Sequence, residues 1–313
     1  MGARSAEIAL GKRACPLLER VCAPALHALA ALSLCAFAAC VHPPPLPPPP
    51  VDPAPGASAA ELRANAEAAE SLLLKIRAAH QQPVTVSGDA KAFVDAEQNG
   101  GRYALMFALR RPDALRIDAL MPWGEPAASL VTSGGKLLFR DDRRKEFYRG
   151  ASTPRNLSLL LPAPLTDREL IDLLAGAMPE LPGADAFSVE DAGDGKKRLV
   201  LRTQPPGLVT TRGLIQSALV APDLTVLEVS RYLDGGGKTE LLWAATLEEQ
   251  GGAGAPGLPS LVHFHIAADS VGQKRDVEID LRLKNLTAGH APPVSAFTLL
   301  PPPEMKIIEL DGR

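Results

Sequence analysis

The architecture of this chain is set by Leu115-Arg116-Ile117-Asp118-Ala119, together with Leu130-Val131-Thr132 and Leu137-Leu138-Phe139 that follow it. Their apolar side chains recur at alternate positions, which is typical of β-strands with one buried face. The turn-forming triplet Ser133-Gly134-Gly135 separates the last two segments. This part of the chain therefore predicts antiparallel strands joined by tight turns.

The same period of two extends in both directions along the chain. Further strands are predicted at residues 84–88, 103–107, 187–190, 197–203, 214–220, 225–232, 239–248, 261–268 and 277–283. Glycine-rich turn signals such as Asp194-Gly195 separate them. Many short strands linked by turns favour one antiparallel sheet that curls on itself.

Two helices are predicted from their N-terminal capping boxes. Ser58 is followed three residues later by Glu61, and an apolar stripe at helical spacing then predicts a helix over 59–79. Thr166 and Glu169 have the same spacing and open a second helix. A short apolar segment at 154–161 precedes it. Helices on the concave face of a curled sheet would give the fold an interior.

The first forty residues have the parts of a secretory signal: basic residues, a short apolar run and small residues before Cys40. The apolar run, from about residue 23 to 39, is shorter than the roughly 20 residues of a membrane-spanning helix. Phe37-Ala38-Ala39-Cys40 resembles the lipobox of bacterial lipoproteins. The resemblance implies cleavage of a signal peptide at residues 1–39 and a diacylglycerol on the Cys40 thiol. The alternative is a buried or single-pass helix with an incidental cysteine.

Residues 40–57 are predicted to be a lipidated cysteine and a proline-rich linker, and residues 58–313 a folded domain. The run from Pro43 to Pro50 favours an extended polyproline II spacer that holds the domain away from the lipid. The alternative is a docking site for a proline-binding partner. All four cysteines lie within the first forty residues, so the domain cannot form disulfides.

The composition excludes a nucleic-acid partner. The chain has a formal net charge of −3, and loss of the signal removes more basic than acidic residues. Nucleic-acid binding would require clustered excess positive charge. Aromatic residues are only 4% of the chain, which favours an interior that bulky rings do not fill.

The order of elements resembles the LolA/LolB superfamily, and within it LolB is the closer match. The resemblance rests on residues 116–130, where a strand and a proline–apolar–glycine turn lead into the next strand, and on 156–165 with 169–179. It implies an α+β, mostly β fold: a half-open antiparallel β-barrel with helices forming a lid over the concave face. The fold would hold the acyl chains of lipoproteins. The chain departs from the family in its linker and in its proline-rich tail at 292–304.

The resemblance implies two sets of functional residues. Trp123, in the turn Pro122-Trp123-Gly124, takes the place of a protruding residue that passes lipoproteins into the membrane; the alternative is a tryptophan folded back over a strand end. The acyl cavity would be lined by one strand face and the lid leucines, with plain core as the alternative. These residues are Tyr103, Leu105, Phe107, Leu115, Ile117, Leu130, Leu170, Leu173 and Leu174.

No catalytic motif is present, and we expect neither enzymatic activity nor a cofactor or metal. His263 and His265 share a strand face with Asp269 and could begin a metal site, but solvent-facing histidines are the favoured reading. Arg110-Arg111 and Arg143-Arg144 could contact anionic lipid headgroups.

The sequence therefore predicts a lipid-anchored protein of the outer membrane that faces the periplasm and helps to localise lipoproteins. It would accept acyl chains from a periplasmic LolA-like carrier. Val41 supports this location, since an aspartate there favours retention in the inner membrane of many Gram-negative bacteria. The alternative is a structural or sensory lipoprotein that uses the same fold as a protein-binding module.

Overall fold

The computed structural model describes residues 46–50, 57–80, 85–97, 100–158, 161, 163–203, 213–235, 238–250, 257–271, 274–290 and 292–310. These residues belong to a compact unit that begins at Leu46. The predictions for the signal segment, for Cys40 and for Val41 lie outside the described residues.

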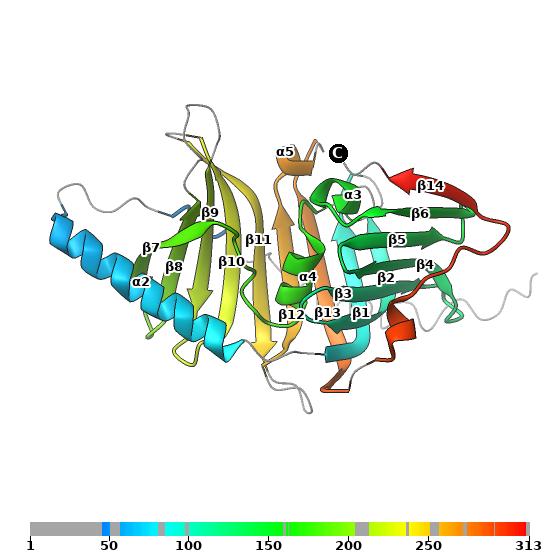
Figure 1. Ribbon diagram of the computed structural model, residues 1–313, viewed down its shortest axis with the longest axis horizontal. Coiled ribbons are helices and arrows are strands. Elements are labelled where there is room, and N and C mark those ends of the chain that lie inside the picture. Colours follow the sequence, from blue (N-terminus) through cyan, green and yellow to red (C-terminus); the bar gives the residue numbers. More distant parts are fainter. Residues whose placement is uncertain are drawn as a thin grey trace, which may run out of the picture. The chain divides into compact units, whose positions relative to one another are not determined.

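Within the described residues, fourteen strands form one sheet (Figure 1). The strands are β1 (Thr85–Asp95), β2 (Gly101–Arg110), β3 (Ala114–Leu120), β4 (Pro126–Ser133), β5 (Lys136–Asp141), β6 (Glu146–Ala151), β7 (Ala184–Asp191), β8 (Lys197–Thr203), β9 (Gly213–Val220), β10 (Val226–Asp234), β11 (Thr239–Gln250), β12 (Pro259–Ile266), β13 (Val277–Ala288) and β14 (Lys306–Leu310). The spatial order is β14-β6-β5-β4-β3-β2-β1-β13-β12-β11-β10-β9-β8-β7. The two end strands do not pair with each other, so the sheet is open.

The helices are short apart from α2 (Ala59–Ala79), and they are α3 (Pro154–Ser158), α4 (Asp167–Leu174), α5 (Ala268–Val271) and the 3₁₀ helix η1 (Val294–Phe297). Both predicted capping boxes are confirmed, since Ser58 caps α2 and Thr166 caps α4. Helix α2 crosses β7 and β8 (Figure 1) and buries Ala69, Leu73 and Ile76 against the sheet.

Strand alternation divides the sheet into two faces. We call the face covered by α2 and α4 the inner face and the opposite one the outer face. A large apolar core on the inner face joins residues of both helices to alternate residues of most strands, from Leu199 on β8 to Leu115 on β3. The predicted fold is therefore confirmed: a mostly β, half-open antiparallel sheet with helices over its concave face.

The C-terminal tail is an integral part of this sheet. Its residues Phe297, Leu299 and Met305 pack with Val131 and Phe147 on the outer face. The chain then pairs β14 with β6, the one parallel pairing in the described sheet. The sequence analysis predicted neither β6 nor β14, because neither segment was recognised by its alternation.

Gly150 makes the close approach of β14 to β6 possible. A Cβ atom at this position would lie 2.7 Å from both the Cβ and the carbonyl oxygen of Leu310. Real Cβ atoms do not come this close to backbone atoms, so a larger residue must displace the end of β14.

We predict that Gly150→Ala detaches β14 and lowers the melting temperature, with faster hydrogen exchange over residues 306–310. In a chain that ends at Pro303 the same substitution should be nearly neutral, because nothing remains for the new methyl group to displace. Equal destabilisation in both backgrounds would contradict this explanation.

Candidate functional site: the inner face beneath helix α4

The apolar inner face changes from exposed to buried along strand β2. Tyr103 is 38% exposed, Leu105 is half-buried, and Phe107 and Leu109 are 6% and 0% exposed. On the antiparallel neighbour β3, Ile117 lies opposite Phe107 and is half-buried, whereas Leu115 lies opposite Leu109 and is fully buried. The face is therefore accessible at one end of these strands and covered at the other.

The accessible end is next to the turn between β3 and β4. The amide of Gly124 donates to the carbonyl of Met121 at 2.9 Å, and Gly124 has a φ of +92°, which favours glycine. Trp123 at the tip is 69% exposed, and its indole Nε1 donates to Glu125 Oε2 at 3.2 Å. Trp123 is thus not folded back over a strand end. Pro122 and Gly124 beside it are exposed as well.

The covered end lies beneath α4. Leu170, Leu173 and Leu174 of this helix are at most 7% exposed and share one apolar core with Phe107 and Leu115. Leu130 belongs to an adjoining cluster with Leu157, and Ile117 contacts both clusters. The structure thus brings eight of the nine candidate residues together in adjoining apolar clusters, with Tyr103 at the accessible margin.

Two buried ion pairs hold α4 to the sheet, and sequence reasoning missed both. Asp172 accepts from Arg111 Nε at 2.8 Å, and Glu169 pairs with Arg231 at 2.8 Å. Burial raises the pKa of Asp172, and the Arg111 charge opposes this rise. Burial also lowers the pKa of Arg231, opposed by Glu169.

Arg111, considered above as a possible contact for lipid headgroups, is instead engaged within the fold. Its guanidinium is directed at α4 and also donates to the carbonyl of His80 at the end of α2. Its neighbour Arg110 lies over the ring of Phe297, 5.3 Å from the ring centroid. The sequence did carry a signal for these partners. Glu169 and Asp172 lie three positions apart on a leucine-rich helix, so acidic groups buried with the leucines would need cationic partners.

Arg231 extends this anchoring to the strands near the β7 end of the sheet. It donates to Gln216 Oε1 at 2.6 Å, and Gln216 Nε2 donates to the carbonyl of Pro179 at 2.9 Å. The guanidinium also lies over Trp243, 5.4 Å from the ring centroid. These contacts attach both α4 and the segment that follows it to β9, β10 and β11.

The histidine pair lies on the outer face, and the expectation that it faces solvent was wrong. His263 and His265 are 7% and 8% exposed because acidic residues of β13 lie opposite them. His263 Nδ1 is 2.6 Å from Asp280 Oδ1, and His265 Nδ1 is 2.6 Å from Glu278 Oε1. Asp269 is not among the partners of either histidine in the described contacts. No group of three or more His, Asp or Glu side chains within the described ranges is arranged to hold a metal ion.

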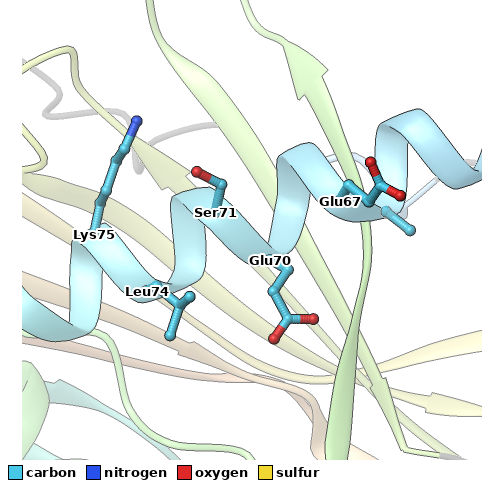
Figure 2. A pocket seen from close by; sticks show the side chains of 6 residues that line it. Glu67, Glu70, Ser71, Leu74 and Lys75 are labelled. Atoms are coloured by element: carbon cyan, nitrogen blue, oxygen red, sulfur yellow. The ribbon is translucent and has the colours of Figure 1, made fainter.

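A shallow groove lies along α2, lined by Ala66, Glu67, Glu70, Ser71, Leu74 and Lys75 (Figure 2). Its lining is mixed in charge and open to solvent, which does not suit an acyl chain. In the described part of the chain, no helix is both long enough and apolar enough to cross a membrane.

No protein-family model matches the chain, and no curated protein matches it either. Several solved structures, in contrast, are similar to it. A DUF1329 family protein from Desulfovibrio piger is 13% identical, with a TM-score of 0.53 over 75% of this chain and 97% of that one. A domain described as an outer-membrane lipoprotein-sorting protein from Vibrio parahaemolyticus is also 13% identical, with a TM-score of 0.51 over 74% and 97%. A LolA-superfamily protein from Nitrosomonas europaea is 15% identical, with a TM-score of 0.49 over 74% and 97%.

The Desulfovibrio and Vibrio structures therefore have the same mostly β fold as this chain. At such low identity they show a shared fold alone. They do not separate a LolB-like protein from other proteins of this architecture.

We predict a stability optimum in mild acid from His263 and Glu278. Burial lowers the pKa of His263, but Glu278 and Asp280 outweigh it and raise that pKa above 6.5, so its stabilisation is lost as pH rises through the raised value. Burial raises the pKa of Glu278, but His263 and His265 outweigh it and lower that pKa from 4.5 to about 2, so its stabilisation is lost below pH 4.5.

Urea unfolding at several pH values checks this prediction. His263→Gln should cost most between pH 4.5 and 6.5 and progressively less in alkaline buffer. His290→Gln, at an exposed position of the tail, is the control and should leave the profile unchanged. A pH-independent cost of the His263 substitution would refute the prediction.

Proposed function

We propose that this protein is a lipid-anchored lipoprotein that binds acyl chains of other lipoproteins on its inner face and helps to localise them to the outer membrane. The observation that carries this proposal is the gradient of exposure along the inner face. Apolar side chains lead from the exposed turn at Trp123 to the buried leucines beneath α4. The likeness in fold to a domain described as lipoprotein-sorting supports it.

The chemistry of the inner face suits an acyl ligand. Its strands present alternate apolar residues, and each methylene that leaves water contributes about 0.8 kcal/mol to binding. Such a ligand is recognised by shape and apolar area and needs few polar groups. Transfer then follows from differential affinity: the face must hold acyl chains better than the carrier does and less well than the membrane.

Helix α4 is the element that would move to admit the ligand. Its leucines occupy the covered end of the face, and its charged side chains are held by Arg111 and Arg231. A buried ion pair gains little over its hydrated components, because desolvation offsets most of the attraction. Release of α4 therefore exchanges these pairs for hydrated charges while an acyl chain replaces the leucine contacts.

Trp123 would meet the bilayer at the accessible end. An exposed indole on a tight turn is suited to the membrane–water interface, where its ring is buried and its N–H stays hydrated. The remaining parts of the proposal are a signal peptide at 1–39, a diacylglycerol on Cys40, an outer-membrane position facing the periplasm, and a LolA-like carrier as partner.

A second candidate function is a structural or sensory lipoprotein that uses this fold to bind a protein. The observation in its favour is that Leu109, Leu115 and Leu173 are fully excluded from solvent. This would be expected of a filled interior. Such a protein would ignore acyl chains, and cargo lipoproteins would still reach the outer membrane after its depletion.

Acyl binding is tested by titrating the full chain in detergent with a fluorescent triacylated peptide. We predict saturable binding that Leu105→Glu weakens at least about tenfold, because a carboxylate on the inner face cannot be buried beside an acyl chain. Met106→Glu is the matched control, since Met106 is 49% exposed and lies on the opposite face of the same strand. No saturable binding, or equal losses in both variants, would remove the proposal.

The turn is tested by the rate at which the bound peptide passes to phosphatidylethanolamine–phosphatidylglycerol vesicles. Trp123→Ala should slow transfer about fivefold and leave the affinity for the peptide unchanged, since the indole contacts the bilayer and not the ligand. Val294→Ala provides the comparison, because Val294 is 74% exposed but lies in the tail. Transfer at the native rate without Trp123 would contradict a role of this turn.

A further inference from the structure

The proline-rich segment at 46–50 is seated on the domain. Tyr232 of β10 is 2% exposed, and its hydroxyl lies 3.2 Å from the carbonyl oxygen of Pro48 and 3.3 Å from that of Pro47. The phenol thus donates to the backbone of a segment far away in the sequence. Part of the expected spacer, residues 46–50, therefore contacts the domain.

The burial of the segment has a period of three. Pro47 is buried and Pro50 is half-buried, whereas Leu46, Pro48 and Pro49 are exposed. A polyproline II helix has three residues per turn, so residues i and i+3 lie on the same edge. One edge of such a helix therefore faces the domain and the other two face solvent.

The surface around Tyr232 has the chemistry that recognises polyproline. Neighbouring strands place an apolar cluster on the outer face, comprising Phe187, Val200, Ile215, Tyr232 and Leu241. Proline lacks an N–H group, and its carbonyl oxygens remain free to accept hydrogen bonds. Polyproline-binding domains combine aromatic residues with donors directed at these carbonyls, and the Tyr232 hydroxyl is such a donor.

We infer that this cluster, which we call the outer strip, is a binding site for a polyproline II segment and that the chain's own residues 46–50 occupy it. Residues 46–50 thus lie on the outer face and do not cover the apolar inner face. Because the segment is covalently linked, its effective concentration is in the millimolar range and favours it over free proline-rich ligands.

The docking also shortens the tether, a consequence that rests on the proposed lipidation of Cys40, whereas the docking itself does not. An extended chain advances about 3.1 Å per residue, so the stretch from Cys40 to Pro47 can reach at most about 20 Å, whereas a stretch from Cys40 to residue 57 could reach about 50 Å. The domain would then work close to the membrane that holds its anchor.

The inference is tested by fluorine NMR of the full chain in detergent after incorporation of 3-fluorotyrosine. The chain has three tyrosines, so Tyr103 and Tyr148 serve as internal references, and Tyr232→Phe assigns the third resonance. Replacing residues 46–50 with glycine and serine should shift the Tyr232 resonance alone. Added peptide of the sequence of residues 43–50 should return it saturably to its native position. A Tyr232 resonance that does not move on replacement would overturn the inference.

Paired substitutions test the period of three without removing the segment. Pro47→Ser with Pro50→Ser should shift the Tyr232 resonance, whereas Pro48→Ser with Pro49→Ser, which alter the exposed edges, should shift it far less. Equal shifts from both pairs would show that no particular edge is bound.

Calorimetry measures the affinity of the site in trans. The glycine–serine chain should bind the peptide, and the native chain should bind it at least about tenfold more weakly because its own segment competes. Tyr232→Phe in the glycine–serine chain should weaken binding about fivefold, the usual net effect of one hydrogen bond. An affinity that is unchanged by Tyr232→Phe, or equal affinities of the glycine–serine and native chains, would overturn the inference. These outcomes do not depend on acyl binding, so failure of the proposed function would leave them intact.

Discussion

The pairing of two buried carboxylates with two arginines is the interaction on which this architecture depends. Helix α4 covers the inner face with leucines, yet it also carries Glu169 and Asp172 into buried positions. An unpaired charge there would cost several kcal/mol, enough to keep the helix off the sheet. Arg231 and Arg111 meet these carboxylates from two separate parts of the sheet, and α4 can therefore lie where it does.

The same two arginines connect helix α4, which would move to admit a ligand, with the rest of the fold. Arg231 connects α4 through Gln216 to the segment at Pro179, and Arg111 connects it to the end of α2. Movement of α4 would thus affect both α2 and the segment at Pro179. When α4 moves away, the charged groups of these ion pairs can be hydrated instead. A helix held by leucines alone would only expose apolar surface to water.

An open sheet must also protect its edges and its second face. Strand β14 covers the edge of β6. At the other end of the sheet, Asn65 Oδ1 of α2 accepts a hydrogen bond from the amide of Val189 on β7, at 2.7 Å. On the outer face, the tail covers β3 to β6, an acid–imidazole network lies on β12 and β13, and residues 46–50 lie at Tyr232. The outer face is therefore well covered in these places, and the inner face is left as the proposed ligand surface.

Local sequence patterns were sufficient to predict much of this fold. Alternation placed Leu105, Phe107, Leu115 and Ile117 on one face, and capping boxes located α2 and α4, because strand faces and helix starts depend on residues a few positions apart. Partners far apart in the sequence were beyond such patterns. The parallel β14–β6 pair, the turn of Arg111 toward Asp172, the burial of His263 against Asp280 and the seating of Pro47 at Tyr232 all arise from folding, which brings together groups that no periodicity relates.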